Sequence, residues 1–131
     1  MSQHIHTHLA PEFPLPFSQA LRAGDFVYVS GQVGVDPATR EVIGETIEEQ
    51  TMQCLRNIET ILAAADLSLD HVVKINAFIS RQEDFPGYNK VYESIMKRPF
   101  PTRTSIGCSI GSYLVEIDAI AYAGSIRGES N

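Results

Sequence analysis

The chain has 131 residues, of which 44% are hydrophobic and 20% charged, and its formal net charge at pH 7 is −6. This length suits one domain spanning residues 1–131, and the composition is that of a globular protein rather than a disordered or fibrous one. Phosphate binding needs clustered Lys and Arg, whereas the 10 basic residues here are scattered along the chain. Nucleic acid is therefore not the expected partner.

Cysteine content and hydropathy exclude two further classes. Cys54 and Cys108 are too few for a disulfide framework or a multi-cysteine zinc site, and we expect both to be small core residues. The chain has no run of about 18 apolar residues that could span a membrane. It does not open with a basic region followed by an apolar core, as a secretory signal would. We therefore expect a cytoplasmic protein without a membrane partner.

The N-terminal segment has little periodicity. Its prolines discourage regular structure, so residues 1–15 are predicted to form a loosely ordered arm. His4, His6 and His8 alternate, and on a strand they would share one face as a possible metal site. We favour the alternative interpretation, a mobile terminal tail, and the role of these histidines stays open.

The first half of the chain predicts a hairpin and a helix. Residues 17–21 and the β-branched and aromatic run 26–30 are predicted strands, separated by a turn at 23–25. A second turn follows at 36–39. Thr46 and Glu49 fit a capping box, and apolar residues then recur at steps of three and four, which predicts a helix to about residue 65.

The second half predicts a strand, a helix and two closing strands. Residues 72–80 alternate as a strand, and residues 84–96 form a helical pattern with Pro86 tolerated in its first turn. Strands at 102–110 and 113–122 are joined by Gly111-Ser112, which suits a two-residue hairpin turn. The order β-β-α-β-α-β-β predicts an α+β fold with one mixed sheet and two helices on one face.

The predicted closing hairpin concentrates the polar residues. Its register would pair Arg103 with Ile120, Ser105 with Asp118, and Gly107 with Glu116. Arg103, Ser105, Gly107 and the two carboxylates would then share one face, with the glycine leaving room for a ligand. From the residues alone, a weak surface ion pair explains this arrangement as well as a binding site does.

Five motifs in this order resemble the Rid (YjgF-type) family over about residues 16–123. They are Ser30-Gly31-Gln32, the helix bearing Gln50-Thr51 and Asn57-Ile58, the Asn89-x-x-Tyr92 element, Pro101-Thr102-Arg103-Thr104, and the closing strand Val115-Glu116-Ile117-Asp118-Ala119. Each motif alone is weak evidence, and the combination is specific.

The resemblance implies a chorismate-mutase-like homotrimer with ligand pockets between subunits. It also implies hydrolysis of reactive 2-imino and enamino acids, such as 2-iminobutanoate and 2-iminopropanoate, to 2-oxo acids and ammonia, without a metal or organic cofactor. By position, Arg103 would bind the substrate carboxylate and Glu116 would hold the attacking water. The remaining substrate-binding positions implied are Phe17, Ser30, Gly31, Asn89 and Ser105.

Three departures from the family pattern leave alternatives open. Many members have Tyr at the position of Phe17 and Cys at the position of Ser105, and the final hairpin is shorter here. One alternative is a protein that binds small carboxylates, or regulates, without turnover. Others are a related deaminase, such as a 2-aminomuconate deaminase, and an endoribonuclease or translation inhibitor, against which the acidic charge argues.

Overall fold

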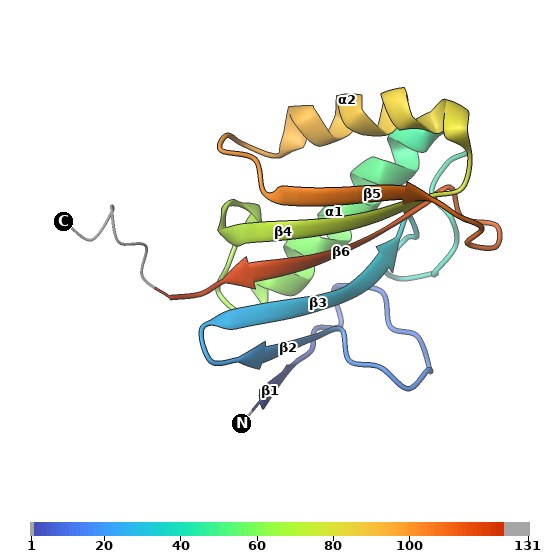
Figure 1. The fold of residues 1–131 in the computed structure, drawn as a ribbon. Helices are drawn as coiled ribbons and strands as arrows, with labels where there is room; N and C mark the ends of the chain where they lie inside the picture. Colours follow the sequence, from blue (N-terminus) through green and yellow to red (C-terminus); the bar gives the residue numbers. More distant parts are fainter. Residues whose placement is uncertain (1, 125–131) are drawn as a thin grey trace.

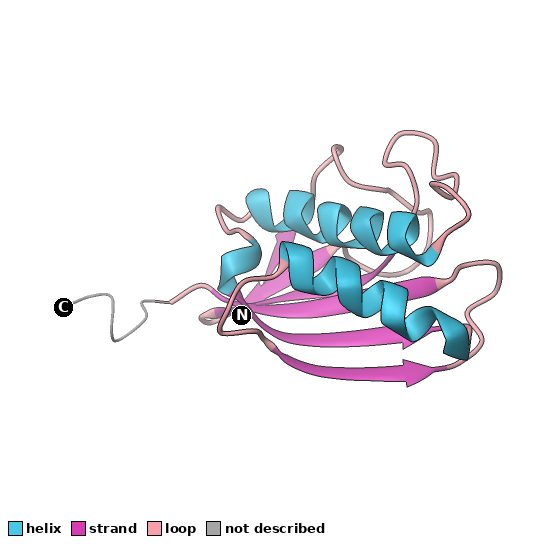
Figure 2. Cartoon of the chain, turned by 90° about the horizontal axis from the view of Figure 1, so that it is seen from above, coloured by secondary structure: helices cyan, strands magenta, loops and turns pink. Residues whose placement is uncertain are grey.

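A computed structural model describes residues 2–124, which form a six-stranded mixed sheet with two helices packed on one of its faces (Figures 1 and 2). The predicted fold class is confirmed. In chain order the elements are β1 Ser2–Ile5, β2 Ala20–Ala23, β3 Phe26–Val33, α1 Ile47–Ala63, β4 Val72–Ile79, α2 Phe85–Ile95, β5 Thr102–Gly107 and β6 Val115–Tyr122, with short 3₁₀ turns at Leu69–His71 and Gln82–Asp84.

Helix α1 forms where the capping box and the apolar stripe predict it. The Thr46 hydroxyl accepts a hydrogen bond from the Glu49 N–H, and the Glu49 carboxylate accepts one from the Thr46 N–H. This reciprocal pair satisfies two backbone donors that the first turn would otherwise leave unpaired. The apolar stripe then packs on the sheet, and its fully buried members include Cys54, Leu55, Ile58, Ile61 and Leu62.

Helix α2 covers the other half of the same sheet face. Pro86 occupies its first turn, where a missing N–H costs nothing. Its buried side chains are Tyr88, Val91 and Tyr92. The helix lies above β5 and beside α1 (Figures 1 and 2), so its tyrosines face the edge strand on which Arg103 lies.

The strand order is β1-β2-β3-β6-β4-β5, and it corrects the predicted closing hairpin. Gly111 does turn the chain, with φ of 66°, but β5 and β6 are not neighbours. β4 lies between them, antiparallel to β6 and parallel to β5. Its alternate residues Ile75, Ala77 and Ile79 are almost wholly buried, so tertiary burial places this strand centrally and overrides the local turn signal.

The corrected pairing also corrects the predicted faces. Arg103 pairs with Ile75 and Ser105 with Ala77, both core residues, so these β5 side chains lie on the helix-covered side. Glu116 pairs with Phe78 and alternates with buried neighbours on β6, so it lies on the open side. Arg103 and Ser105 therefore do not share a face with Glu116 and Asp118, contrary to prediction.

The N-terminal segment is ordered from residue 2, which is a second correction. β1 pairs antiparallel with β2, and Ile5 and Ala10 are buried in the core. An extended segment satisfies the otherwise unpaired edge of β2. A strand of four residues with only one buried side chain has too little periodicity to reveal itself in the sequence.

The start of β2 also differs from the prediction. It begins at Ala20, so Phe17 lies in the preceding loop rather than in a strand. In the part of the chain that the structure describes, neither helix has the length and apolar character needed to cross a bilayer.

Candidate functional site

Arg103 lies on edge strand β5, against the aromatic face of α2. Its guanidinium carbon is 5.2 Å from the ring centroid of Tyr88 and 4.8 Å from that of Tyr92. Cation–π contact with the two rings therefore positions the guanidinium. Among residues 2–124, Arg103 takes part in no ion pair. The guanidinium is thus positioned, and no carboxylate among the described residues pairs with it.

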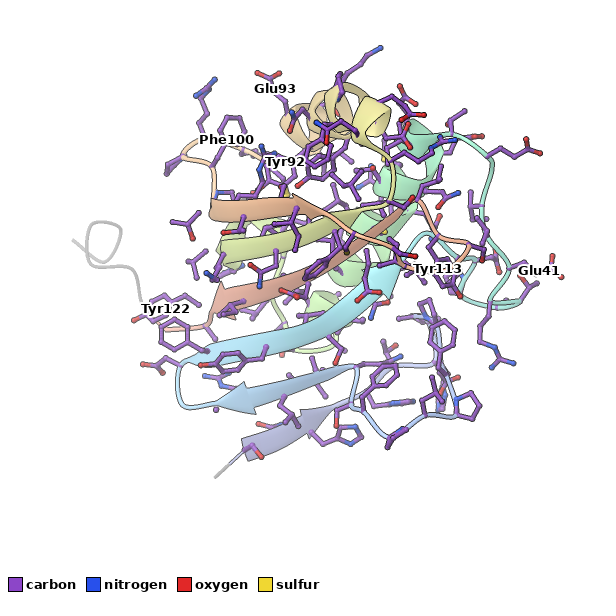
Figure 3. The ribbon with its side chains drawn as sticks, turned by 45° about the vertical axis from the view of Figure 1, so that its right-hand side comes forward. Glu41, Tyr92, Glu93, Phe100, Tyr113 and Tyr122 are labelled. Carbon is purple, nitrogen blue, oxygen red and sulfur yellow. The ribbon has the colours of Figure 1, made fainter. Side chains whose placement is uncertain are left out.

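A cavity of about 330 Å³ opens beside this arginine. Figure 3 shows Tyr92, Glu93 and Phe100 gathered at this edge of the molecule, far from Tyr113. The predicted residues Asn89 and Arg103 both line it. We call this cavity the arginine pocket; its lining residues are Asn89, Tyr92, Glu93, Phe100, Pro101 and Arg103.

Ser105 is hydrogen-bonded to a buried tyrosine of α2. Its hydroxyl shares a hydrogen bond of 3.1 Å with the Tyr88 hydroxyl. Tyr88 is wholly buried, and burial raises its pKa despite the opposing effects of Ser105 and Arg103. Tyr88 therefore supports Arg103 through its ring and Ser105 through its hydroxyl. Its helical spacing signals only burial, so the sequence could not reveal this double role.

Glu116 lies on β6 at the open face of the sheet, over a bulge in β3. Register is lost between Val29 and Gln32, so Ser30 and Gly31 together face one residue of β6. A Cβ atom on Gly31 would collide with the Glu116 carboxylate, whose Cδ would be only 3.0 Å away. The glycine therefore makes the space that the Glu116 side chain occupies.

Ser30 anchors the bulge to the segment that precedes β2. Its hydroxyl donates to the Ser18 carbonyl at 2.6 Å, and its N–H donates to the Gln19 carbonyl at 2.9 Å. These bonds place the 13–17 loop beside Glu116. A cavity of about 410 Å³, here called the glutamate pocket, lies between them; its lining residues are Phe13, Leu15, Phe17, Ser30, Gly31, Val33, Tyr113 and Glu116.

Two carboxyl groups on this face have raised pKa values. Burial raises the pKa of Glu116, and the nearby Asp118 charge adds to the effect. Burial also raises the pKa of Asp118. The hydrogen bond that the Asn76 amide donates to this carboxylate at 3.0 Å lowers the pKa and so opposes part of that rise. A carboxyl group with a raised pKa is a better proton acceptor near neutral pH than an ordinary one. Because Asp118 is held by Asn76, Glu116 is the one turned to the cavity.

The predicted site residues thus fall into two groups rather than one. Phe17, Ser30, Gly31 and Glu116 meet in the glutamate pocket, whereas Asn89 and Arg103 meet in the arginine pocket with Ser105 beside them. The register puts Glu116 level with Ile106 across β4, so the Cα atoms of Arg103 and Glu116 are roughly 14 Å apart on strand spacings. Their side chains also leave opposite faces of the sheet. One chain cannot bring them onto one small substrate.

Several lining residues were missed by the sequence analysis. Phe13, Leu15 and Tyr113 line the glutamate pocket, and Phe100 lines the arginine pocket. All four lie in irregular loops, and Tyr113 was predicted as the first residue of a strand. The sequence does offer one signal for a pocket wall at 13–17. This run carries apolar residues between prolines, and the predicted elements provide no core in which they could be buried.

Comparison with known proteins bears on the identity of this fold and site. Residues 7–123 match the family described as endoribonuclease L-PSP. A 2-iminobutanoate/2-iminopropanoate deaminase of Dermatophagoides farinae is 37% identical over 103 residues, covering 79% of this chain and 80% of that protein.

Two solved structures superpose closely. RidA of a Psychrobacter species has a TM-score of 0.86 at 37% identity, covering 92% of this chain and 98% of that one. Escherichia coli TdcF, solved with bound serine, has a TM-score of 0.86 at 31% identity, covering 93% and 99%. With the family match across nearly its whole folded length, the chain belongs to the endoribonuclease L-PSP family, the family of the Rid proteins.

Proposed function

We propose that this protein hydrolyses small 2-imino acids, and the enamino acids in equilibrium with them, to 2-oxo acids and ammonia. The observation that carries the proposal concerns the Arg103 guanidinium. It lies over the rings of Tyr88 and Tyr92 and has no ion-pair partner among residues 2–124. A planar fork of N–H donors matches a carboxylate in a bidentate manner. The deaminase named among the relatives and the serine-bound TdcF structure support a ligand of the amino-acid class.

Glu116 is proposed to act on the water. Its carboxylate accepts a proton as water attacks the carbon of the protonated imine, which gives a tetrahedral amino alcohol. The same carboxyl group then returns that proton to the amino nitrogen, and it takes up the hydroxyl proton as the C=O bond forms, the C–N bond breaks and ammonia leaves. The raised pKa of Glu116 suits both transfers, and such general acid–base catalysis contributes about 10²–10⁴-fold.

The active site is proposed to form between two copies of the chain. The arginine pocket of one subunit would meet the glutamate pocket of its neighbour, because the two lie on opposite faces of one sheet. The open face of the sheet supports association, since it exposes the apolar side chains Leu21, Phe26, Tyr28 and Ile106. A homotrimer of the kind implied for the family would place three such sites at its three interfaces.

The glutamate pocket favours substrates with a short apolar side chain. Phe13, Leu15 and Phe17 line one side of it and Val33 and Tyr113 another, and its lining contains no cationic residue. 2-Iminobutanoate and 2-iminopropanoate fit this lining. A 2-aminomuconate-type substrate carries a second carboxylate, for which this wall offers no partner.

The test generates the imine in situ and follows its hydrolysis. An L-amino-acid oxidase converts 2-aminobutanoate to the imine, and semicarbazide captures what is not hydrolysed first. Wild-type protein should lower the initial rate of semicarbazone formation, because the 2-oxo acid reacts with semicarbazide more slowly than the imine does, whereas Arg103→Ala should not. Arg56→Ala is the matched control, because among residues 2–124 the ion pair of that exposed arginine is with Glu59 on the surface of α1.

Two outcomes would contradict the proposal. No decrease by wild type would exclude imine hydrolysis, and calorimetry with 2-oxobutanoate would then decide whether the protein binds small carboxylates without turnover. Equal decreases by wild type and Arg103→Ala would exclude the role of the arginine.

A further inference from the structure

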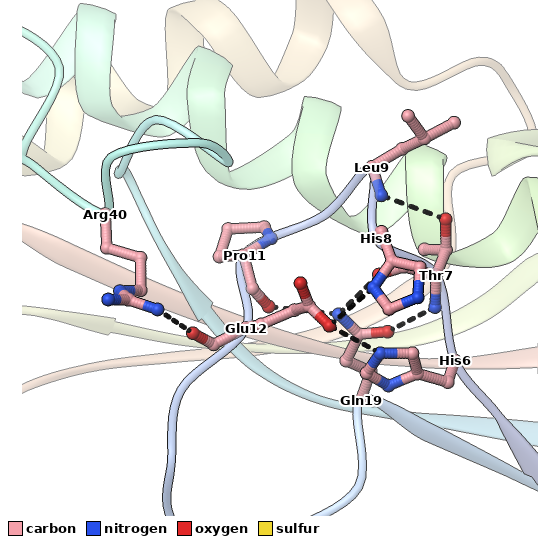
Figure 4. Close-up of polar contacts among 8 residues, drawn as sticks. All are labelled: His6, Thr7, His8, Leu9, Pro11, Glu12, Gln19 and Arg40. Carbon is pink, nitrogen blue, oxygen red and sulfur yellow. Dashed lines mark hydrogen bonds and ion pairs between the residues drawn. The ribbon is translucent and has the colours of Figure 1, made fainter.

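We propose that His6, His8 and Glu12 form a site for a divalent transition-metal ion, with Zn²⁺ as the best match. The three residues lie on the N-terminal segment that joins β1 to β2, and their ligand atoms all lie within 4.8 Å of one another. Figure 4 shows both imidazole rings turned toward the same carboxylate. This site is separate from the arginine and glutamate pockets.

The ligand atoms already converge on one point. His6 Nε2 lies 2.7 Å and His8 Nδ1 lies 2.9 Å from the same Glu12 oxygen, Oε2. Zinc bonds of about 2.0–2.1 Å in tetrahedral geometry place ligand atoms ~3.3 Å apart. The two nitrogen–oxygen separations therefore have to open by only about half an ångström to admit the ion. The His8 side chain is 84% exposed, so its ring can turn freely to do so.

The Gln19 side chain holds the backbone of the segment that carries the ligands. The buried Gln19 side chain accepts a hydrogen bond from the Thr7 N–H at 2.8 Å and donates to the carbonyls of Thr7 and Pro11. It thus fixes the residue between the two histidines and the residue before Glu12. These bonds order the backbone from which the ligand side chains project before an ion binds.

Two further contacts fix the same segment. Arg40 donates to the Glu12 carbonyl at 2.7 Å, and the buried side chains of Ile5 and Ala10 tie the arm to the core on either side of the histidines. A mobile tail could carry the same three side chains only at an entropic cost on binding. Here the backbone of the segment is already ordered.

The donor set selects the class of metal. Two imidazole nitrogens and one carboxylate oxygen suit zinc and its neighbours in the first transition series, whereas Ca²⁺ and Mg²⁺ prefer an all-oxygen set. Three protein ligands leave one tetrahedral position for water. Because Glu12 is followed directly by Phe13, which lines the glutamate pocket, a bound ion would also stiffen one wall of that pocket.

The experiment titrates the full-length protein with Zn²⁺ by calorimetry, in a buffer that does not chelate the ion and with excess Mg²⁺ present. We expect one ion per chain and a rise in Tm on addition of Zn²⁺. His6→Ala, His8→Ala and Glu12→Gln should each weaken binding at least about tenfold. These residues are at the surface, so the variants should keep the wild-type circular dichroism spectrum.

His4→Ala is the matched control, since His4 lies on the same arm but outside the ligand set. It should bind Zn²⁺ with wild-type affinity. The proposal is overturned if wild type binds less than one ion per chain, or if His4→Ala loses as much affinity as His6→Ala. Unchanged binding by Glu12→Gln would also overturn it, because two exposed histidines alone would then explain the affinity.

Discussion

The Glu116 carboxylate lies directly against Gly31. It occupies the space that the Cβ atom of any larger residue at position 31 would fill. Gly31→Ala is therefore expected to push Glu116 out of its position over the β3 bulge. A displacement of about 1 Å commonly costs on the order of 100-fold in rate. We expect kcat for imine hydrolysis to fall by about that factor while the circular dichroism spectrum is retained. Gly107→Ala is the control, because its Cβ would meet nothing closer than the Ile79 carbonyl at 3.6 Å. Equal losses in both variants would contradict this role of Gly31.

The two tyrosines beneath Arg103 should respond differently to loss of their hydroxyl groups. The Tyr88 hydroxyl bonds to Ser105, whereas the buried Tyr92 hydroxyl has no hydrogen-bond partner among the described residues. Tyr88→Phe should lower the free energy of unfolding by about 1 kcal/mol, and Tyr92→Phe should leave it unchanged or raise it. Urea unfolding at constant protein concentration measures both. The account of this edge fails if Tyr92→Phe proves the more damaging change.

Glu116→Gln should change how stability depends on pH. Burial and then the Asp118 charge raise the pKa of Glu116 in the folded chain. Such a group favours folding fully below its unfolded pKa, and this contribution is lost as pH rises through the folded pKa. The neutral glutamine should therefore raise the free energy of unfolding at pH 7, with the gain vanishing below about pH 4. Glu41→Gln, at an exposed position, is the comparison. A gain that persists unchanged at low pH would rule out ionisation as its cause.

Arg103→Lys tests the shape of the donor group rather than its charge. Lysine keeps the positive charge but cannot form two parallel hydrogen bonds to one carboxylate, and it lacks the planar group that lies over Tyr88 and Tyr92. We expect kcat/KM to fall ~10- to 100-fold, the equivalent of one strong charge-assisted hydrogen bond. Steady-state kinetics over a range of imine concentrations gives the value. Wild-type kcat/KM in this variant would mean that a simple point charge is enough.

Much of the fold could be predicted because local chemistry and burial agree over most of the chain. The Thr46–Glu49 capping box and the alternation along β6 both survive in the structure. The position of β4 between β5 and β6 could not be predicted, because Gly111-Ser112 carries an authentic turn signal and strand order depends on which strand the core buries most completely. β1 could not be predicted either, because Ile5 is its only side chain that enters the core.

The residues proposed for the site from the sequence lie at cavities, but not in the arrangement that was predicted. Arg103, Asn89, Ser30, Gly31 and Glu116 all line cavities. Their assignment to one face rested on a strand pairing that does not exist. The loop residues that shape the glutamate pocket lie outside any periodic pattern, so their positions depend on the Ser30 and Gln19 hydrogen bonds.

The central claim is that Arg103 of one subunit and Glu116 of another act on the same substrate, and subunit mixing tests it most directly. Arg103→Ala and Glu116→Gln proteins, each inactive alone, are unfolded together in equal amounts and refolded. In a closed ring of randomly mixed subunits, about a quarter of the interfaces pair an intact arginine with an intact glutamate. The account predicts recovery of roughly that fraction of wild-type imine hydrolysis. No recovery in a mixture that has demonstrably exchanged subunits would contradict it.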